Sequence, residues 1–264
     1  MKSSRPRQFG YDYATRFKKR SLVENYKFRP SYPDETYDLI LDLLGDVNKT
    51  ILDVGCGTGK IARNIVEFVE KVDAVDFSEE MIKEGQSLIN GNHSNLQWIH
   101  GDIETVKLFP PYKLVTAGAS IHWMDWDIVF PRFKDVLTSD GYLVIIDGDR
   151  PIQPPWEMDE NALISKFSTN QHYESIDLIQ ELIDRRFLLL IDDKKTTPIN
   201  YSQSLQDYIQ SFHSRESLSK EDMGEKKADE FDSKLVEILS PFTDDNGILT
   251  YKLETKVSWG IPLT

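Results

Sequence analysis

The chain has a single cysteine and no long apolar run, which argues against a disulfide-rich protein and against a membrane-spanning protein. Cys56 is the single cysteine among 264 residues, so no internal disulfide framework exists and a reducing compartment fits. The longest apolar run, Phe187 to Ile191, is far shorter than the roughly 20 residues that a membrane-spanning helix needs. No apolar segment of the kind found in secretory signals follows Met1. We therefore expect a cytoplasmic protein without a membrane partner.

Positive charge is also scarce. The net charge is −13, which disfavours nucleic-acid binding because such binding depends on Lys and Arg neutralising phosphates. Residues 1–20 are the exception, with seven basic residues and one acidic residue, so the rest of the chain carries −19. A transit peptide or an RNA contact stays open for this segment, but we favour a solvated leader followed by a helix that covers the active site.

Several catalytic and metal-binding patterns are missing. The five histidines show no metal-ligand spacing, and one cysteine cannot form a Cys/His cluster, so we expect no metal. No Gly-x-Ser-x-Gly nucleophile elbow occurs either. These absences argue against zinc hydrolases and serine hydrolases.

The most informative segment that is present is a glycine loop. An apolar, strand-like run ends at Asp53, glycines follow at alternate positions 55, 57 and 59, and a helical pattern comes next. Glycine permits positive φ and lets a ligand approach the backbone, while the start of the following helix offers unpaired N–H groups. The order of strand, glycine loop and helix therefore predicts a ligand cradle.

The glycine spacing discriminates between ligands. A dinucleotide-binding loop reads G-x-G-x-x-G, but here the third glycine comes one residue early and Lys60 takes its place. A P-loop needs a hydroxyl after Gly-Lys, and Ile61 stands there. The remaining pattern, D-x-G-x-G-x-G, resembles motif I of the class I S-adenosylmethionine (SAM)-dependent methyltransferases. The resemblance assigns cofactor contacts to Asp53, Gly55, Cys56, Gly57, Thr58 and Gly59.

Three later segments extend the resemblance over residues 50–147. Asp76 closes the next strand, where its carboxylate would accept hydrogen bonds from two ribose hydroxyls. Gly101-Asp102-Ile103-Glu104 resembles the motif whose Asp accepts from the adenine amino group. The segment from Tyr112 to Trp123 resembles motif IV, except that Lys113 replaces the usual Asp. The resemblance adds Asp76, Phe77, Met81, Asp102, Ile103 and Ala119 to the cofactor contacts.

Strands alternate with helical patterns up to residue 150, which predicts βαβ units and a parallel sheet. The expected strands are 50–54, 72–75, 96–99, 114–117 and 142–146, with a turn at 139–141. Prolines then interrupt this pattern. Four helical stretches follow, the last of them at 219–240, and the segments 187–191 and 249–259 are further strand candidates. The resemblance implies a doubly wound α/β fold with a mostly parallel seven-stranded sheet, an antiparallel last strand and a helical lid. We expect a covering segment at 1–33, a SAM-binding core at 34–150, a lid with one sheet strand at 151–248, and the last strand at 249–264.

Two features suggest the trans-aconitate methyltransferase-like group of small-molecule enzymes. They are Arg29-Pro30-Ser31-Tyr32-Pro33 before the first core helix and Ile121-His122-Trp123 after the fourth strand. The substrate side would then hold Tyr26, Arg29, Tyr32, His122 and Trp123. His122 is the candidate catalytic residue, as a general base or as a wall of the pocket, and we favour the wall because a sulfonium donor is already activated.

The resulting hypothesis is methyl transfer from SAM to a carboxylate, hydroxyl or amine of a small molecule, which yields S-adenosylhomocysteine. Two alternatives stay open. One is a SAM-binding regulatory protein without turnover, and the other is a nucleotide-cofactor oxidoreductase, which the glycine spacing disfavours. The identity of the acceptor and the choice between monomer and homodimer are left open, because function depends on the pocket more than on the fold.

Overall fold

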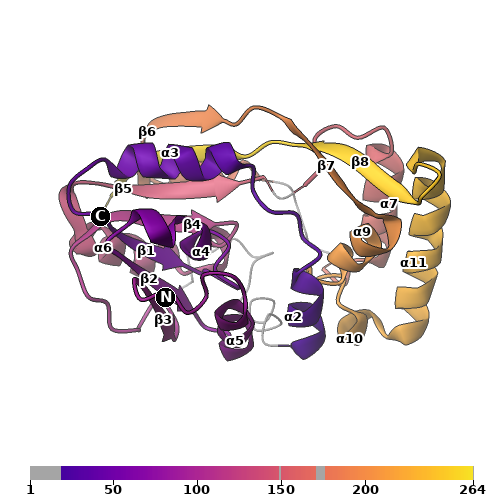
Figure 1. Ribbon diagram of the computed structural model, residues 1–264, viewed down its shortest axis with the longest axis horizontal. Helices are drawn as coiled ribbons and strands as arrows, with labels where there is room; N and C mark the ends of the chain where they lie inside the picture. Colours follow the sequence, from indigo (N-terminus) through magenta and orange to yellow (C-terminus); the bar gives the residue numbers. More distant parts are fainter. Residues whose placement is uncertain (1–18, 149, 171–175, 264) are drawn as a thin grey trace.

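The computed structural model describes residues 19–148, 150–170 and 176–263. Its central sheet has seven strands in the order β3-β2-β1-β4-β5-β9-β6 (Figure 1). Strands β1 to β5 run parallel, and β9 runs antiparallel to both of its neighbours, β5 and β6. The expected doubly wound, mostly parallel sheet with an antiparallel last strand is confirmed. The strands are β1 (Thr50–Val54), β2 (Lys71–Asp76), β3 (Leu96–His100), β4 (Tyr112–Gly118), β5 (Leu137–Asp147), β6 (Leu188–Lys195) and β9 (Lys256–Pro262).

Helices cover both faces of the sheet because successive strand residues point to opposite sides. Ile51 of β1 packs into one apolar cluster with the first group of helices, and Leu52 packs into a second cluster on the other face. The first face carries α3 (Asp34–Leu44), α4 (Ala62–Ile65) and η3 (Val66–Phe68), and the second carries α6 (Trp126–Val136) and α8 (Leu178–Asp184). Helix α5 (Glu79–Ser87) contacts β2 and β3, and the short η4 (Ile121–Trp123) follows β4.

A second unit, the lid, has an apolar core of its own and a two-stranded antiparallel sheet. Figure 1 places it beyond the end of the central sheet, with helix α2 (Arg20–Tyr26) in between. Its elements are α7 (Glu157–Phe167), β7 (Ile199–Ser204), α9 (Leu205–Phe212), α10 (Lys220–Met223), α11 (Glu225–Leu239), η5 (Ser240–Phe242) and β8 (Ile248–Leu253). Among the described residues, no helix is long and apolar enough to span a bilayer.

The strand predicted over 249–259 is in fact two strands in two sheets. β8 pairs with β7 in the lid, and β9 pairs with β5 and β6 in the core. The chain passes between the sheets at Thr255, whose N–H donates to Thr196 Oγ1 at 2.9 Å and whose carbonyl accepts from Thr196 N at 2.9 Å. Thr196 lies in the matching passage from β6 to β7, so the two crossings stabilise each other.

Two other local expectations were wrong. Residues 139–141 continue β5 instead of forming a turn, and the irregularity appears as a register shift opposite Tyr112 and Leu114. The single helix expected at 219–240 is interrupted at Gly224, where φ is +79°. Strand β7 had not been expected.

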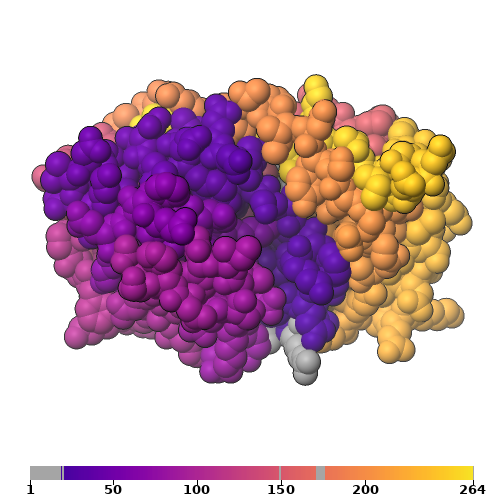
Figure 2. All heavy atoms as spheres, viewed as in Figure 1, coloured from indigo at the N-terminus to yellow at the C-terminus, as the bar shows by residue number. Residues whose placement is uncertain are grey.

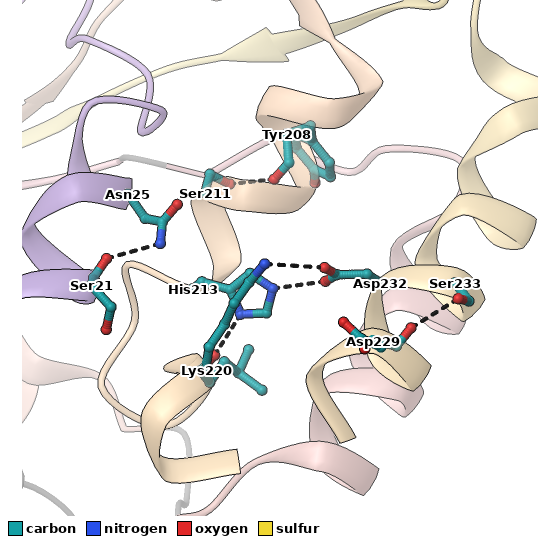
Figure 3. Close-up of polar contacts among 10 residues, drawn as sticks. Ser21, Asn25, Tyr208, Ser211, His213, Lys220, Asp229, Asp232 and Ser233 are labelled. Atoms are coloured by element: carbon teal, nitrogen blue, oxygen red, sulfur yellow. Dashed lines mark hydrogen bonds and ion pairs between the residues drawn. The ribbon is translucent and has the colours of Figure 1, made fainter. Parts of the chain in front are cut away.

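The end of α9 is fixed inside the lid by a buried histidine. His213 Nδ1 lies 2.8 Å from the Leu218 carbonyl oxygen, and Nε2 lies 2.7 Å from Asp232 Oδ1 of α11 (Figure 3). Lys220 Nζ approaches the second carboxylate oxygen of Asp232 at 3.6 Å. Both ring nitrogens thus contact groups of the lid, which hold the ring in one orientation. This arrangement fixes the position of the next residue, Ser214, which accepts hydrogen bonds from Arg29.

Candidate active site

A cavity lies at the carboxyl ends of β1 to β4, where a parallel sheet places the segments that follow its strands. The space between its lining residues is about 840 Å³ and includes a part that is open to solvent. Residues from all four strand ends meet in it. The lining residues are Tyr26, Arg29, Gly55, Gly57, Val75, Asp76, Phe77, Met81, Gly101, Asp102, Ile103, Glu104, Gly118, Ala119, Ser120, Trp123 and Met124.

The glycine loop forms one wall of the cavity with backbone alone. Gly55 and Gly57 have φ values of +60° and +56°, which side chains rarely adopt. A Cβ on Gly55 would lie 2.6 Å from Ser120 Cβ, so the loop and the segment after β4 are in direct contact only because this residue is glycine. The two segments therefore share one wall of the cavity.

Asp76 connects the glycine loop to the end of β2. Its carboxylate accepts from Gly57 N at 2.7 Å and from Ser78 N at 2.8 Å. Burial raises the pKa of Asp76 to about 6, partly offset by these hydrogen bonds. An ionised carboxylate can accept about four hydrogen bonds, so Asp76 keeps acceptor capacity for a ligand.

Asp53, at the start of the glycine loop, is hydrogen-bonded to β4 and to α4. Its carboxyl group accepts from Thr116 Oγ1 of β4 at 2.9 Å and from Ala62 N of α4 at 3.3 Å. Asp53 lines a smaller adjoining cavity, together with Cys56 and Tyr32. Burial raises the pKa of the Cys56 thiol well above its usual range, so the thiol stays protonated and is no nucleophile. Asp53, Cys56 and Tyr32 thus lie behind the main cavity.

The wall opposite the glycine loop comes from α2 and the residues after it. The Arg29 guanidinium donates to Ser214 Oγ at 2.7 Å and to the Ser214 carbonyl at 2.9 Å, and it stacks 4.8 Å from the centre of the Tyr26 ring. Lys60 Nζ donates to the carbonyls of Arg29 and Pro30 at 3.1 and 2.8 Å. The lysine that follows the third glycine therefore binds this covering segment and not a phosphate.

The covering segment joins the core to the lid. Leu22 and Val23 of α2 pack on Met81 of α5, while Lys19 Nζ pairs with Asp222 of the lid at 2.6 Å. In Figure 2 the indigo atoms of this segment fill the region between the purple core and the orange lid. Residues 1–18, for which a transit peptide, an RNA contact or a solvated leader had been considered, lie outside the described part of the chain.

The structure places three expected site residues elsewhere. Gly59 faces Trp98, whose ring would lie 2.6 Å from a Cβ there, so packing and its φ of +74° require this glycine. Thr58 is buried, and its carbonyl accepts from Arg63 Nε at 2.7 Å. His122 is half-buried in η4 beside the Trp123 ring, 4.9 Å away between ring centres. None of the three lines either cavity described above.

Sequence reasoning missed Glu104 as a site residue. Its side chain lines the cavity, and burial together with a hydrogen bond to the Asp102 carboxyl raises its pKa to about 7. Ser120 and Met124 of the segment after β4 were missed as well. The Gly-Asp-Ile-Glu motif held the signal for Glu104, but its spacing alone does not show which carboxyl group faces a cavity. Among the described residues, no group of three or more His, Cys, Asp or Glu could hold a metal.

The buried carboxyl groups predict a pH dependence of stability. Burial raises the pKa of Asp53 from 3.8 to about 7, so between these values the folded protein holds a proton that the unfolded chain has released. Stability should then fall as pH rises through this window. Residue 53 cannot ionise in the Asp53→Asn variant. The difference between its free energy of unfolding and that of wild type should therefore increase by up to about 4 kcal/mol from pH 4 to pH 8. Urea unfolding at several pH values measures the difference, and a difference that does not change with pH would contradict the expectation.

The comparisons with known proteins agree with this geometry. Residues 51–141 match a family of methyltransferase domains. A malonyl-[acyl-carrier protein] O-methyltransferase of Halalkalibacterium halodurans is 35% identical over 86 residues, which cover 30% of this chain and 31% of that protein. An uncharacterized RNA methyltransferase of Clostridium acetobutylicum is 28% identical over 197 residues, which cover 66% of this chain and 42% of that protein. The chain thus spans less than half the length of these two relatives.

Solved structures share the whole architecture. A type II methyltransferase structure from Anaeromyxobacter dehalogenans superposes with a TM-score of 0.62 at 16% identity, over 89% of this chain and 98% of that one. At this identity the similarity shows the fold. Residues 51–141 thus match a methyltransferase domain, and the strand order and the cavity at the strand ends agree with the fold of the class I SAM-dependent methyltransferases.

Proposed function

We propose that the protein transfers the methyl group of SAM to a small-molecule nucleophile, with S-adenosylhomocysteine as the second product. The observation that carries the proposal is the single cavity in which the glycine loop, Asp76, Asp102 and the segment after β4 meet. Each of these groups follows a different parallel strand, and the cavity brings them together at one edge of the sheet.

The residues present fit SAM in shape and in charge. Gly55 and Gly57 would lie beside its homocysteine end, Asp76 would accept from the ribose hydroxyls, and Asp102 would accept from the adenine amino group. Phe77 and Ile103 supply apolar surface for the adenine ring. When bound, SAM supplies a methyl group already activated on a cationic sulfonium.

The charge of the cavity argues against the oxidoreductase alternative. Three carboxyl groups, those of Asp76, Asp102 and Glu104, line the cavity together with one guanidinium, that of Arg29. Such a cavity favours a cationic ligand and repels the pyrophosphate of a dinucleotide. Comparing the shift in melting temperature with SAM and with NADH separates the two ligand classes.

A small acceptor is consistent with a site that α2, Arg29 and the lid cover on one side. The acceptor would reach the segment after β4 from the side that α2, Arg29 and the lid cover, and this cover would limit the access of water. The relative that methylates malonyl-[acyl-carrier protein] supports a carboxylate acceptor, as does the resemblance to the trans-aconitate group. The net charge of −13 argues against RNA, although one relative is named an RNA methyltransferase.

The test is a screen for S-adenosylhomocysteine formation with carboxylic acids, phenols, amines and total RNA as acceptors. Turnover with a small acid, phenol or amine supports the proposal. Turnover with RNA alone would refute the small-molecule acceptor, and SAM binding without turnover on any acceptor would favour the regulatory alternative. Product mass spectrometry identifies the atom that is methylated.

His122→Asn should have a small effect on turnover. Its ring lies beside Trp123 and outside the lining of the cavity, so we expect kcat to stay within about three-fold and the effect to fall on the KM of the acceptor. Steady-state kinetics beside His93→Asn, a control remote from the cavity, measures this. A general base would contribute about 10²–10⁴-fold, so a hundredfold loss of kcat at unchanged KM would make His122 the base.

A further inference from the structure

Glu104 joins the two loops that build opposite parts of the cavity. It belongs to the loop after β3, and its Oε1 accepts from Asp125 N at 2.8 Å. Asp125 is the residue at which the segment after β4 ends and α6 begins. On the other side, Glu104 N donates to Asp102 Oδ1 at 3.2 Å. Through its backbone N–H and its side chain, Glu104 thus connects the Asp102 carboxylate to the segment that carries Ser120, Trp123 and Met124.

The contact between the two carboxyl groups needs a proton. Burial, followed by a hydrogen bond to the Asp102 side chain, raises the pKa of Glu104, and the N–H of Asp125 opposes this only in part. Two ionised carboxylates cannot hydrogen-bond to each other, so one of the pair carries the proton. The groups that shift this pKa are Asp102 from the same loop and the backbone N–H groups of Asp125 and Glu104.

We propose that Glu104 is a proton-dependent positioning residue that, when protonated, holds Asp102 and the segment after β4 in the arrangement that binds the methyl donor. This inference rests on the proposed function and adds to it a residue and a dependence on pH. Glu104 takes its proton from solvent and donates it in a hydrogen bond to the Asp102 carboxylate. Its other oxygen accepts from Asp125 N.

Loss of that proton should open the arrangement. Glu104 and Asp102 would then repel each other, and one of them would move away from its partner. If Glu104 moves, the segment after β4 loses its contact at Asp125. If Asp102 moves, the adenine amino group loses its acceptor. Both outcomes weaken ligand binding as pH rises through neutrality.

Calorimetric titration with S-adenosylhomocysteine tests the proposal, because this ligand lacks the sulfonium charge that a carboxylate would attract. Glu104→Gln still donates to Asp102 and still accepts from Asp125 N, but it cannot titrate. We expect it to bind like wild type at pH 6 and about tenfold more tightly than wild type at pH 8.5, as a one-unit difference in pKa between the bound and free protein implies. Glu104→Ala should bind more weakly than Glu104→Gln at every pH, and exposed Glu67→Gln should follow wild type throughout.

A measurement on the unaltered protein makes the test independent of the variants. At pH 7.5, titrations in buffers of different ionisation enthalpy should show net proton uptake on binding, because the ligand buries Glu104 further and burial is the largest cause of its raised pKa. Binding with no proton uptake in wild type, or identical pH profiles for wild type and Glu104→Gln, would overturn the proposal. Absence of any binding by wild type would instead refute the proposed function.

Discussion

Replacing Gly57 by valine should weaken SAM binding by at least about 100-fold, or ~2.7 kcal/mol. Gly57 has a φ of +56°, where a β-branched residue is strained, and its N–H donates to Asp76. A Cβ there would lie 3.5 Å from the Tyr26 hydroxyl, so the two further methyl groups of valine would press on Tyr26 or enter the cavity. The substitution therefore changes the loop, the carboxylate and the opposite wall at once. Calorimetry measures the affinity, and circular dichroism checks the fold.

Gly247→Val is the matched control for backbone strain. Gly247 also has positive φ, +72°, but it lies in the lid before β8, and no atom lies within 4 Å of a Cβ there. This variant should lose stability and keep its affinity for SAM. Affinity close to wild type in a folded Gly57→Val protein would show that the loop does not touch the ligand.

Asp76→Ala should produce the second large loss of affinity. The carboxylate would accept from two ribose hydroxyls, and hydrogen bonds to a charged acceptor contribute about 1.5–3 kcal/mol each. Its removal also frees Gly57 N and Ser78 N, which hold the glycine loop at the end of β2. We expect at least a hundredfold weaker binding at pH 7.5, where a carboxyl group with a pKa of about 6 is mostly ionised.

The order of two variants distinguishes a ligand contact from a structural role. Asp102→Asn should weaken binding less than Asp76→Ala, because the amide oxygen can still accept from the adenine amino group. If Asp76→Ala binds as tightly as wild type, Asp76 is only the residue that orders the start of α5. If Asp102→Asn has the larger effect, the assignment of ribose and adenine to the two carboxylates is wrong.

The positions at the strand ends were predictable from sequence for a simple physical reason. A buried parallel strand reads as an apolar run, and the polar residue that ends it lies at the edge where its neighbours also end. Asp76 and Ala119 follow such runs, Asp102 follows the partly exposed edge strand β3, and all three residues line one cavity. The glycines at 55 and 57 carry the same information, because their backbone conformation excludes side chains.

Other features of the site depend on contacts between distant segments. Gly59 resembles a third ligand glycine, but it is required by Trp98 on β3, 39 positions further on. Glu104 is held by a hydrogen bond from Asp125 N, and Arg29 by a hydrogen bond to Ser214 of the lid. The break between β8 and β9 depends on Thr196, since the alternation of apolar residues continues across it. Spacing along one segment carries no signal for such pairs.

The covering segment explains why a site on a common fold should be selective. Lys60 holds Arg29 and Pro30 against the glycine loop, and Arg29 in turn binds Ser214, whose place His213 fixes within the lid. Core, covering segment and lid are thus linked by hydrogen bonds around one cavity. Changes in the lid can alter the acceptor side without changing the strand ends that bind the cofactor.

A crystal structure of the protein with S-adenosylhomocysteine tests the central claim most directly. We predict the homocysteine end beside Gly55 and Gly57, both ribose hydroxyls within hydrogen-bond distance of Asp76, and the adenine amino group on Asp102. The sulfur should face the segment after β4, toward Ser120 and Trp123. A ligand bound elsewhere, or a cavity that stays empty in crystals grown with saturating S-adenosylhomocysteine, would contradict the account.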